Sequence, residues 1–201
     1  MNGDLKRRQL LEAAVRVFAA KGFHAARVGD IAAEAGVAHG LLYHYFRSKD
    51  ELLETVFRDT WTAMLARFSE VEESDDPAPE KLRKLVALVL RTWRRDQNLV
   101  RVLVREVTRS PHLSMEVDEV AGAFAAIERV VAKGQGEGEL RERVDPRLAA
   151  VVVYGAVEEI LTGWVLGQLP DSDDDIAAAE RAVVSIVCDG LVPEPVAAVT
   201  A

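Results

Sequence analysis

The sequence predicts an all-α protein in which a small basic N-terminal part precedes a larger acidic part. Apolar residues recur at spacings of three and four along nearly all of the 201 residues, and alternating strand-like runs joined by hairpin turns are missing. Residues 1–50 carry eight Lys/Arg and five Asp/Glu, a net charge of +3, whereas residues 51–201 carry seventeen and twenty-eight, a net charge of −11. The 49 % apolar and 29 % charged residues are typical of a soluble globular protein.

The first helix is expected over residues 4–21. Leu11, Ala14 and Phe18 recur at i, i+3 and i+7 and form an apolar stripe along one side of such a helix. Gly22 follows the last residue of the stripe, where glycine commonly ends a helix.

Two short helices follow. A second stripe from Ile31 to Ala35 is closed by Gly36, and a third helix is expected over 38–46. Ser48 then suits the cap of a fourth helix, 49–71, with Glu51 three residues later completing a capping box.

The rest of the chain predicts helices separated by acidic, proline-rich or glycine-rich breaks. The breaks are SDDPAPE (74–80), GQGEGE (134–139) and LPDSDDD (169–175), while Asp145 followed by proline predicts a capped helix start. The expected helices are 80–95, 99–109, 114–134, 146–169 and 176–190.

Residues 28–46 predict a helix-turn-helix, whose second helix fits the major groove of DNA. Gly36 lies in the turn because glycine adopts a left-handed backbone at little cost. Val37, Leu42 and Phe46 are spaced to face the core. This leaves for the outer face His39, Gly40, Leu41, Tyr43, His44 and Tyr45. An ordinary helical hairpin with aromatic core residues is the alternative.

The segment VGDIAAEAGVAHGLLYHYFRSKDELL closely resembles the DNA-binding signature of TetR-family transcriptional regulators. The shared features are Ile31-Ala32, the Ala-Gly-Val turn ending at Val37, the run from Tyr43 to Phe46, and Lys49 followed by two acids and a leucine. The upstream LLEAAVRVFAAKGFHAARV matches the first helix of the family. The resemblance covers residues 6–57 and implies a DNA-binding domain over 1–50 and a ligand-binding and dimerisation domain over 51–201.

The resemblance also implies roles for single residues. Tyr43 and Lys49 match phosphate contacts, as their donor groups suit, while His39, Gly40 and Leu41 match positions that face base edges. Tyr45 or His44 is expected to add backbone contacts.

The chain departs from the family pattern at two helix starts. Arg27 and Ala38 stand where a threonine or serine commonly caps a helix, and the loss of a cap costs about 1 kcal/mol. Arg27 is expected to reach a phosphate instead. Leu41 stands where a small polar residue is common, and it suits contact with a thymine methyl group.

The acidic part is expected to form a homodimer. Small and apolar residues follow one side of each of the last two helices, so that a four-helix interface with two-fold symmetry can form. These are Leu148, Val152, Gly155, Ala156, Glu159 and Gly163, and then Ala179, Val183, Ile186, Val187 and Gly190. Packing within one chain is the alternative.

A ligand pocket is expected among the middle helices, although the same residues also suit a core. The candidate lining residues are Leu85, Val89, Trp93, Val104, Arg105, Arg109, Phe124, Ile127, Tyr154 and Trp164. The stretch RERVDPRLAAVVVYGAVEEILTGWVL resembles the branch of the family that senses long-chain acyl-CoA. An arginine-rich run from Arg91 to Arg109 suits the phosphates of such a ligand, with a solvated face paired to acids as the alternative. A hydrophobic drug-like effector, as in repressors of efflux or catabolic operons, is the alternative.

Other function classes fit the sequence less well. The adjacent carboxylates Glu158 and Glu159 diverge on a helix, and Ile176 replaces the glycine that a calcium loop beginning at Asp171 requires. The N-terminal MNGDLKRRQ has cations without a following apolar run, so no signal peptide is expected. The single Cys188 suits a reducing compartment. The sequence therefore predicts a cytoplasmic homodimeric repressor, released from a pseudo-palindromic operator by a hydrophobic effector, without enzymatic activity, metal, cofactor or membrane partner.

Overall fold

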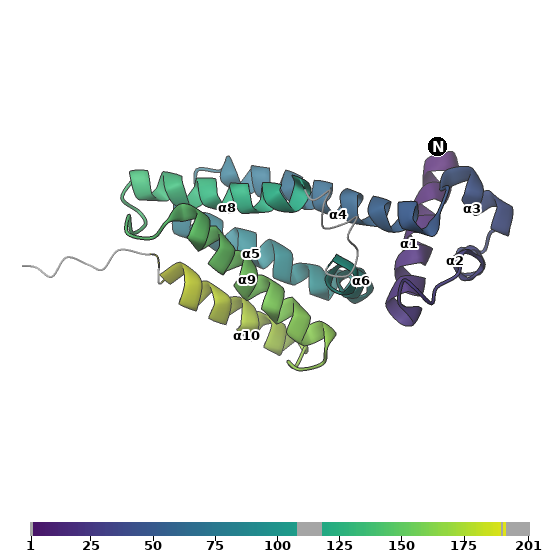
Figure 1. Cartoon of the computed structure of the whole chain (residues 1–201). Helices are drawn as coiled ribbons and strands as arrows, with labels where there is room; N and C mark the ends of the chain where they lie inside the picture. Colours follow the sequence, from purple (N-terminus) through teal and green to yellow (C-terminus); the bar gives the residue numbers. More distant parts are fainter. Residues whose placement is uncertain (1, 108–117, 190, 192–201) are drawn as a thin grey trace, which may run out of the picture. The chain divides into compact units, whose positions relative to one another are not determined.

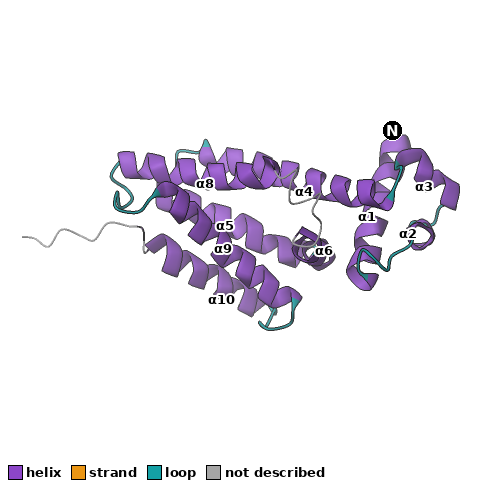
Figure 2. Cartoon of the chain, viewed as in Figure 1, coloured by secondary structure: helices purple, strands orange, loops and turns teal. Residues whose placement is uncertain are grey.

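The computed structural model describes residues 2–107, 118–189 and 191. Within these ranges every regular element is a helix and there is no strand (Figure 2). The all-α prediction is therefore confirmed, and Figure 1 gives the helix labels used below.

The residues pack into two compact units. The first contains residues 1–63 and 92–119, and the second contains residues 64–91 and 120–201. Helix α4, Lys49–Glu72, begins in the first unit and ends in the second, and α5, Ala78–Arg95, passes from the second unit into the first. The predicted domain boundary at residue 50 follows the change in charge along the sequence. The two units follow packing instead, so that α4 and α5 each contribute residues to both.

The first unit is built on α1, Asn2–Lys21, which packs against α2, Val28–Glu34, and against α6, Gln97–Val107. Helix α3, His39–Tyr45, packs on α2. The core of this unit is apolar and includes Leu10, Ala14, Phe18, Ile31, Leu42, Phe46 and Leu52, all at most 2 % exposed. Gly22 ends α1 with a φ of 77°, as its position after the apolar stripe predicted.

The second unit contains α8, Asp118–Gly136, from its third residue onward, and α9, Pro146–Val165. It also contains α10, Asp173–Val183, which continues as a wider π-helical turn, Val184–Asp189. Asp145 caps α9 as predicted, because the Leu148 N–H donates to its carboxylate at 2.9 Å. Helix α10 begins three residues earlier than expected. Ser172 caps it, with its hydroxyl accepting from the Asp175 N–H at 3.3 Å.

Gly134 allows the end of α8 to lie close to the start of α5. A Cβ at this position would lie 2.4 Å from the Ala78 Cβ and 3.0 Å from the Leu140 Cδ1. The Ala78 N–H is held there by the Glu139 carboxylate at 2.6 Å. The Leu140 Cδ1 can shift by rotation of its side chain, but the Ala78 Cβ moves only with its backbone, so an added methyl group must displace backbone.

We expect Gly134→Ala to lower the free energy of unfolding by about 1–3 kcal/mol through overpacking. Gly136→Ala is the matched control on the same helix, because a Cβ there meets no atom within 4 Å. Urea titrations followed by circular dichroism compare the two variants. Equal unfolding midpoints would contradict the close approach of α8 and α5.

Candidate nucleic-acid interface and effector domain

Helices α2 and α3 are joined by a tight turn that depends on Gly36. Its φ is 64°, in the left-handed region that favours glycine. The Gly36 N–H donates to the Ala33 carbonyl at 3.1 Å, and the Val37 N–H donates to the Ala32 carbonyl at 3.0 Å. These bonds satisfy carbonyls at the end of α2 and fix where α3 begins.

Helix α3 presents one buried side and one exposed side. Leu42 on α3 and Phe46 at its C-cap are buried, and Val37 in the preceding turn is half-buried, as the spacing predicted. On the outer side, four residues are exposed, namely His39, Gly40, Tyr43 and His44. Leu41 and Tyr45 are half-buried. The outer face therefore consists of rings and donor groups around a glycine.

Two edge-on ring pairs order this outer face. The His39 and Tyr43 ring centres are 5.3 Å apart, and those of His44 and Tyr45 are 5.2 Å apart. The Tyr43 side chain remains 51 % exposed, so its hydroxyl is accessible. A Cβ at Gly40 would meet no atom within 4 Å, so the backbone there is open to close approach.

The starts of α2 at Arg27 and of α3 at Ala38, which lack the usual threonine or serine, differ in their hydrogen bonds. At α2 the Asp30 carboxylate accepts from the Arg27 N–H at 3.0 Å and pairs with the Lys21 ammonium at 2.9 Å. The hydrogen bond from Lys21, with that from the Arg27 backbone, lowers the pKa of Asp30. The Arg27 side chain itself is exposed, as a phosphate contact requires. At Ala38 no side chain caps α3.

Lys49 has a structural role that the sequence did not predict. Its ammonium group donates to the carbonyl oxygens of Phe23, His24 and Ala26 at 2.7, 3.4 and 3.1 Å. It also lies 4.3 Å from the centre of the Phe23 ring. An ammonium has three donors, so in this arrangement they are directed at the α1–α2 turn. A phosphate contact by Lys49 stays a prediction.

Glu106 on α6 holds the same turn from the other side. Its carboxylate is only 6 % exposed and accepts from the Phe23 N–H at 3.5 Å. The N–H and the carbonyl group of Phe23 are thus bound by side chains from α6 and α4. These partners are 83 and 26 residues away in sequence, so no local pattern indicates them.

The start of α4 confirms the predicted cap and corrects its geometry. The Glu51 N–H donates to the Ser48 hydroxyl at 3.1 Å. The Glu51 carboxylate accepts from the Arg47 N–H at 2.6 Å, one residue before the position that a regular capping box uses.

The predicted pocket residues are divided between the two units. The first unit contains Trp93, Val104 and Arg105, whereas the second contains Leu85, Val89, Phe124, Ile127, Tyr154 and Trp164. Arg109 lies outside the described residues. A pocket formed by all of these residues therefore stays a prediction.

Within the second unit, two of these residues form one aromatic pair. The rings of Phe124 and Tyr154 are 4.4 Å apart, and burial raises the pKa of Tyr154 to about 12, which keeps its hydroxyl neutral. Leu85, Ile127 and Trp164 are buried. The Trp164 indole donates to the Pro170 carbonyl at 3.1 Å, which ties α9 to the following turn.

Helix α9 carries an exposed apolar face. Leu148, Val151 and Val152 are 64, 49 and 60 % exposed, and Ile186 after α10 is 77 % exposed. Among the described helices, α9 is also the one long and apolar enough to suit a membrane span, with a mean hydropathy of 1.5. That is weak evidence, because helices of soluble cores and interfaces share this composition.

Two residues predicted to lie on the interface belong to packing within the chain. Gly163 is buried against Leu169, whose Cδ1 would lie 2.7 Å from an added Cβ, and Val183 is 6 % exposed. The side chain of Val187 and the whole of Gly190 lie outside the described residues.

Comparison with known proteins assigns both parts of the chain. Residues 10–56 match the family described as bacterial regulatory proteins, tetR family, and residues 57–190 match the YsiA-like protein, C-terminal region. The fatty acid metabolism regulator protein of Bacillus subtilis is 30 % identical over 185 residues, covering 91 % of this chain and 94 % of that protein. The HTH-type transcriptional regulator TtgR of Pseudomonas putida is 33 % identical over 188 residues, covering 87 % and 86 %.

The fold agrees with these matches. The crystal structure of the transcriptional regulator FadR from Bacillus subtilis in complex with stearoyl-CoA superposes with a TM-score of 0.81 at 28 % identity, covering 92 % of this chain and 98 % of that chain. The protein belongs to the TetR family of bacterial regulatory proteins.

Proposed function

We propose that the protein is a cytoplasmic, homodimeric transcriptional repressor that binds a pseudo-palindromic operator and is released by long-chain acyl-CoA. The observation that carries the DNA-binding part is the exposed face of α3, with its ring pairs and open Gly40, in a chain that belongs to the TetR family. Such a helix fits the major groove, and two copies in a dimer read two half-sites.

The exposed face of α9 supports the dimer. Leu148, Val151 and Val152 form an apolar strip that a soluble protein covers most simply with a second copy of itself. Ile186, after α10, is a further exposed apolar residue of the second unit. We infer an isologous four-helix interface between copies.

The proposed effector is supported by the relatives. The fatty acid metabolism regulator protein is 30 % identical over nearly the whole chain, and the FadR structure contains stearoyl-CoA. A hydrophobic drug-like effector, as in repressors of efflux or catabolic operons, is the alternative.

Fluorescence anisotropy on the DNA upstream of the gene, with and without palmitoyl-CoA, tests the proposal. Release at micromolar ligand is the expected result. Tight binding that palmitoyl-CoA does not change would leave the repressor and exclude this effector. By linkage, the operator must weaken acyl-CoA binding by the same factor as acyl-CoA weakens operator binding.

Tyr43→Phe is expected to weaken operator binding by roughly ten- to a hundredfold, since a hydrogen bond to a charged group such as a phosphate contributes about 1.5–3 kcal/mol. Because a phosphate contact carries no sequence information, the loss should be similar on all duplexes. Anisotropy on the operator and on a scrambled duplex measures both. A change in preference at one base pair would contradict the role of Tyr43.

His39→Ala is expected to relax discrimination among operator variants at one base pair per half-site, at a cost of about 1–3 kcal/mol for the preferred base. His44→Ala, also an exposed histidine of α3 but further along it, is the matched control. Affinities for a panel of single-base operator variants give the answer. Unchanged discrimination in His39→Ala would remove His39 from base readout.

A further inference from the structure

A surface groove in the second unit carries more positive than negative charge. It has a volume of about 510 Å³ and lies along the end of α4, α5 from Glu80 to Arg91, and the end of α10 with the following Val184. Five cations line it, namely Arg67, Arg83, Lys84, Arg91 and Arg181, together with three glutamates, and Asp76 beside it pairs with Lys84, so that the net charge is +1. By contrast, residues 51–201 as a whole have a net charge of −11. The volume is within the range of small-molecule sites, roughly 300–1,000 Å³.

Arg91 has one edge fixed and one edge open. Its Nε and Nη2 donate to the Glu180 carboxylate at 3.1 and 2.8 Å, which joins α5 to α10 and raises the pKa of the guanidinium. A guanidinium has five donors, so the Nη1 edge remains directed away from this pair. Arg91 is therefore positioned by Glu180 and keeps donors for a phosphate, whose geometry the guanidinium matches.

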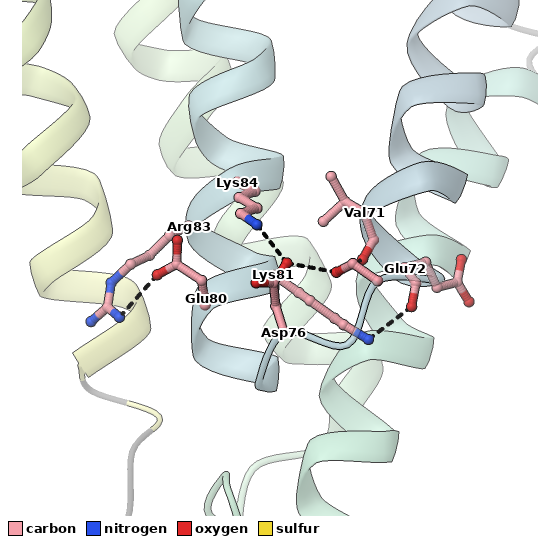
Figure 3. Close-up of polar contacts among 8 residues, drawn as sticks. Val71, Glu72, Asp76, Glu80, Lys81, Arg83 and Lys84 are labelled. Atoms are coloured by element: carbon pink, nitrogen blue, oxygen red, sulfur yellow. Dashed lines mark hydrogen bonds and ion pairs between the residues drawn. The ribbon is translucent and has the colours of Figure 1, made fainter.

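Lys84 gives a second cation on the same face of α5. It is seven residues before Arg91, a separation of about 10.5 Å along a helix. Its ammonium group pairs with the Asp76 carboxylate, which also accepts from the Ser74 hydroxyl at 2.7 Å (Figure 3). The pair is partly exposed, and such pairs contribute little to stability. An incoming phosphate can therefore share Lys84 at small cost.

The neighbouring Lys81 has a structural role and does not line the groove. Only 4 % exposed, it donates to the Glu72 carbonyl at 2.8 Å and so closes the end of α4 (Figure 3). It fixes the α4–α5 turn that carries Asp76. The groove is also lined by four apolar residues, called the apolar strip below, which a base can contact. These are Val71, Ala87, Leu88 and Val184.

We propose that this groove binds the phosphorylated nucleotide of coenzyme A, with Arg91 and Lys84 contacting phosphates and the apolar strip contacting the base. The proposal rests on the proposed function, because it gives the acyl-CoA effector a place for its charged head. Free coenzyme A has the same nucleotide, so the two sources are separated by experiment. Palmitate lacks the nucleotide, so the affinity of the protein for palmitate should not depend on Arg91 and Lys84.

The test is isothermal titration calorimetry of the full-length protein with palmitoyl-CoA, coenzyme A and palmitate. Arg91→Gln is expected to weaken binding of palmitoyl-CoA on the order of tenfold, because a charge-assisted contact is lost. Lys84→Gln should act in the same direction. The affinity for palmitate should change less than twofold in both variants.

Arg129→Gln is a closely matched control. Arg129 also uses Nε and Nη2 to bind a glutamate of another helix, Glu72, at 2.6 and 2.8 Å, but neither residue lines the groove. The exposures of the two pairs are similar, 62 and 22 % for Arg91 and Glu180 against 58 and 26 % for Arg129 and Glu72. Arg129→Gln should leave the affinity for palmitoyl-CoA within twofold.

The outcomes separate this proposal from the function. A loss confined to Arg91→Gln and Lys84→Gln, whether seen with palmitoyl-CoA or with coenzyme A alone, supports the groove. Unchanged binding in both, or an equal loss in Arg129→Gln, overturns the groove and leaves the acyl-CoA effector intact. If the wild-type protein binds neither palmitoyl-CoA nor coenzyme A, the proposed effector and the proposed nucleotide site are both wrong. The measurement of operator binding then still tests whether the protein is a repressor.

Discussion

Replacing Lys49 with methionine is expected to lower the free energy of unfolding by about 2–3 kcal/mol, since hydrogen bonds to a charged group contribute more than neutral ones and three carbonyls lose their donor. Methionine keeps the length and the apolar part of the side chain, so the expected loss comes from the ammonium group. The turn it holds connects α1 to α2, and α2 positions α3. Operator affinity should therefore decrease together with stability.

Two further variants separate the structural role of Lys49 from its predicted phosphate contact. Lys49→Arg keeps the positive charge, but a planar guanidinium cannot direct three donors as the ammonium does. Lys21→Met removes an exposed cation of α1 that pairs with Asp30 and should cost much less stability. Urea unfolding followed by circular dichroism gives stability, and the salt dependence of operator binding counts phosphate contacts.

A stability of Lys49→Met equal to that of the wild type would show that the carbonyl contacts contribute nothing. If Lys49→Arg restored operator affinity and its salt dependence without restoring stability, both roles would hold. If it restored neither, the contribution of Lys49 to binding would act through the shape of the turn alone.

The parts of the fold that could be predicted are those with a local cause. Gly22 and Gly36 end helices because of the backbone they permit, and Asp145 and Ser48 cap helices through bonds to residues three positions ahead. The sides of α3 followed from spacing, because Leu42 and Phe46 are four residues apart and both buried. Such causes lie within one helical turn, which a sequence pattern records.

The parts that could not be predicted depend on residues far apart in sequence. Lys49 and Glu106 meet at Phe23, and nothing near any of them indicates the other two. Likewise, Arg91 and Glu180 form an ion pair across 89 residues of sequence. Arginine and glutamate are common on any exposed helix, so the sequence does not indicate that these two residues pair. The prediction that Gly163 lies on the dimer interface was wrong, because a small residue suits an interface between chains and equally suits close packing within one chain. In the structure Gly163 packs against Leu169.

Replacing Val152 with glutamate is expected to convert the dimer into monomers at micromolar concentration and to weaken operator binding by at least a hundredfold. Val152 is 60 % exposed in one chain, so the substitution should leave the fold of each copy unchanged. In an isologous interface each residue is contributed by both copies, so one substitution introduces two carboxylates. Burying an unpaired charge costs several kcal/mol, which exceeds the contribution of most single interface residues.

Analytical ultracentrifugation measures the oligomeric state, and circular dichroism checks that the fold is retained. Leu5→Glu is the control, because Leu5 is an exposed leucine of α1, 54 % accessible, outside the proposed interface. It should remain dimeric. A dimeric Val152→Glu would place the interface on another surface, and the apolar face of α9 would then need a different partner.

The loss of operator affinity in a monomer carries a further argument about regulation. A monomer presents the same α3 to one half-site, so its binding measures the contact between one head and DNA. The difference from the dimer measures the coupling of two heads, which is the quantity an effector must alter to release the protein. If palmitoyl-CoA weakens binding of the dimer but not of the Val152→Glu monomer, the effector acts on the arrangement of the two heads rather than on α3.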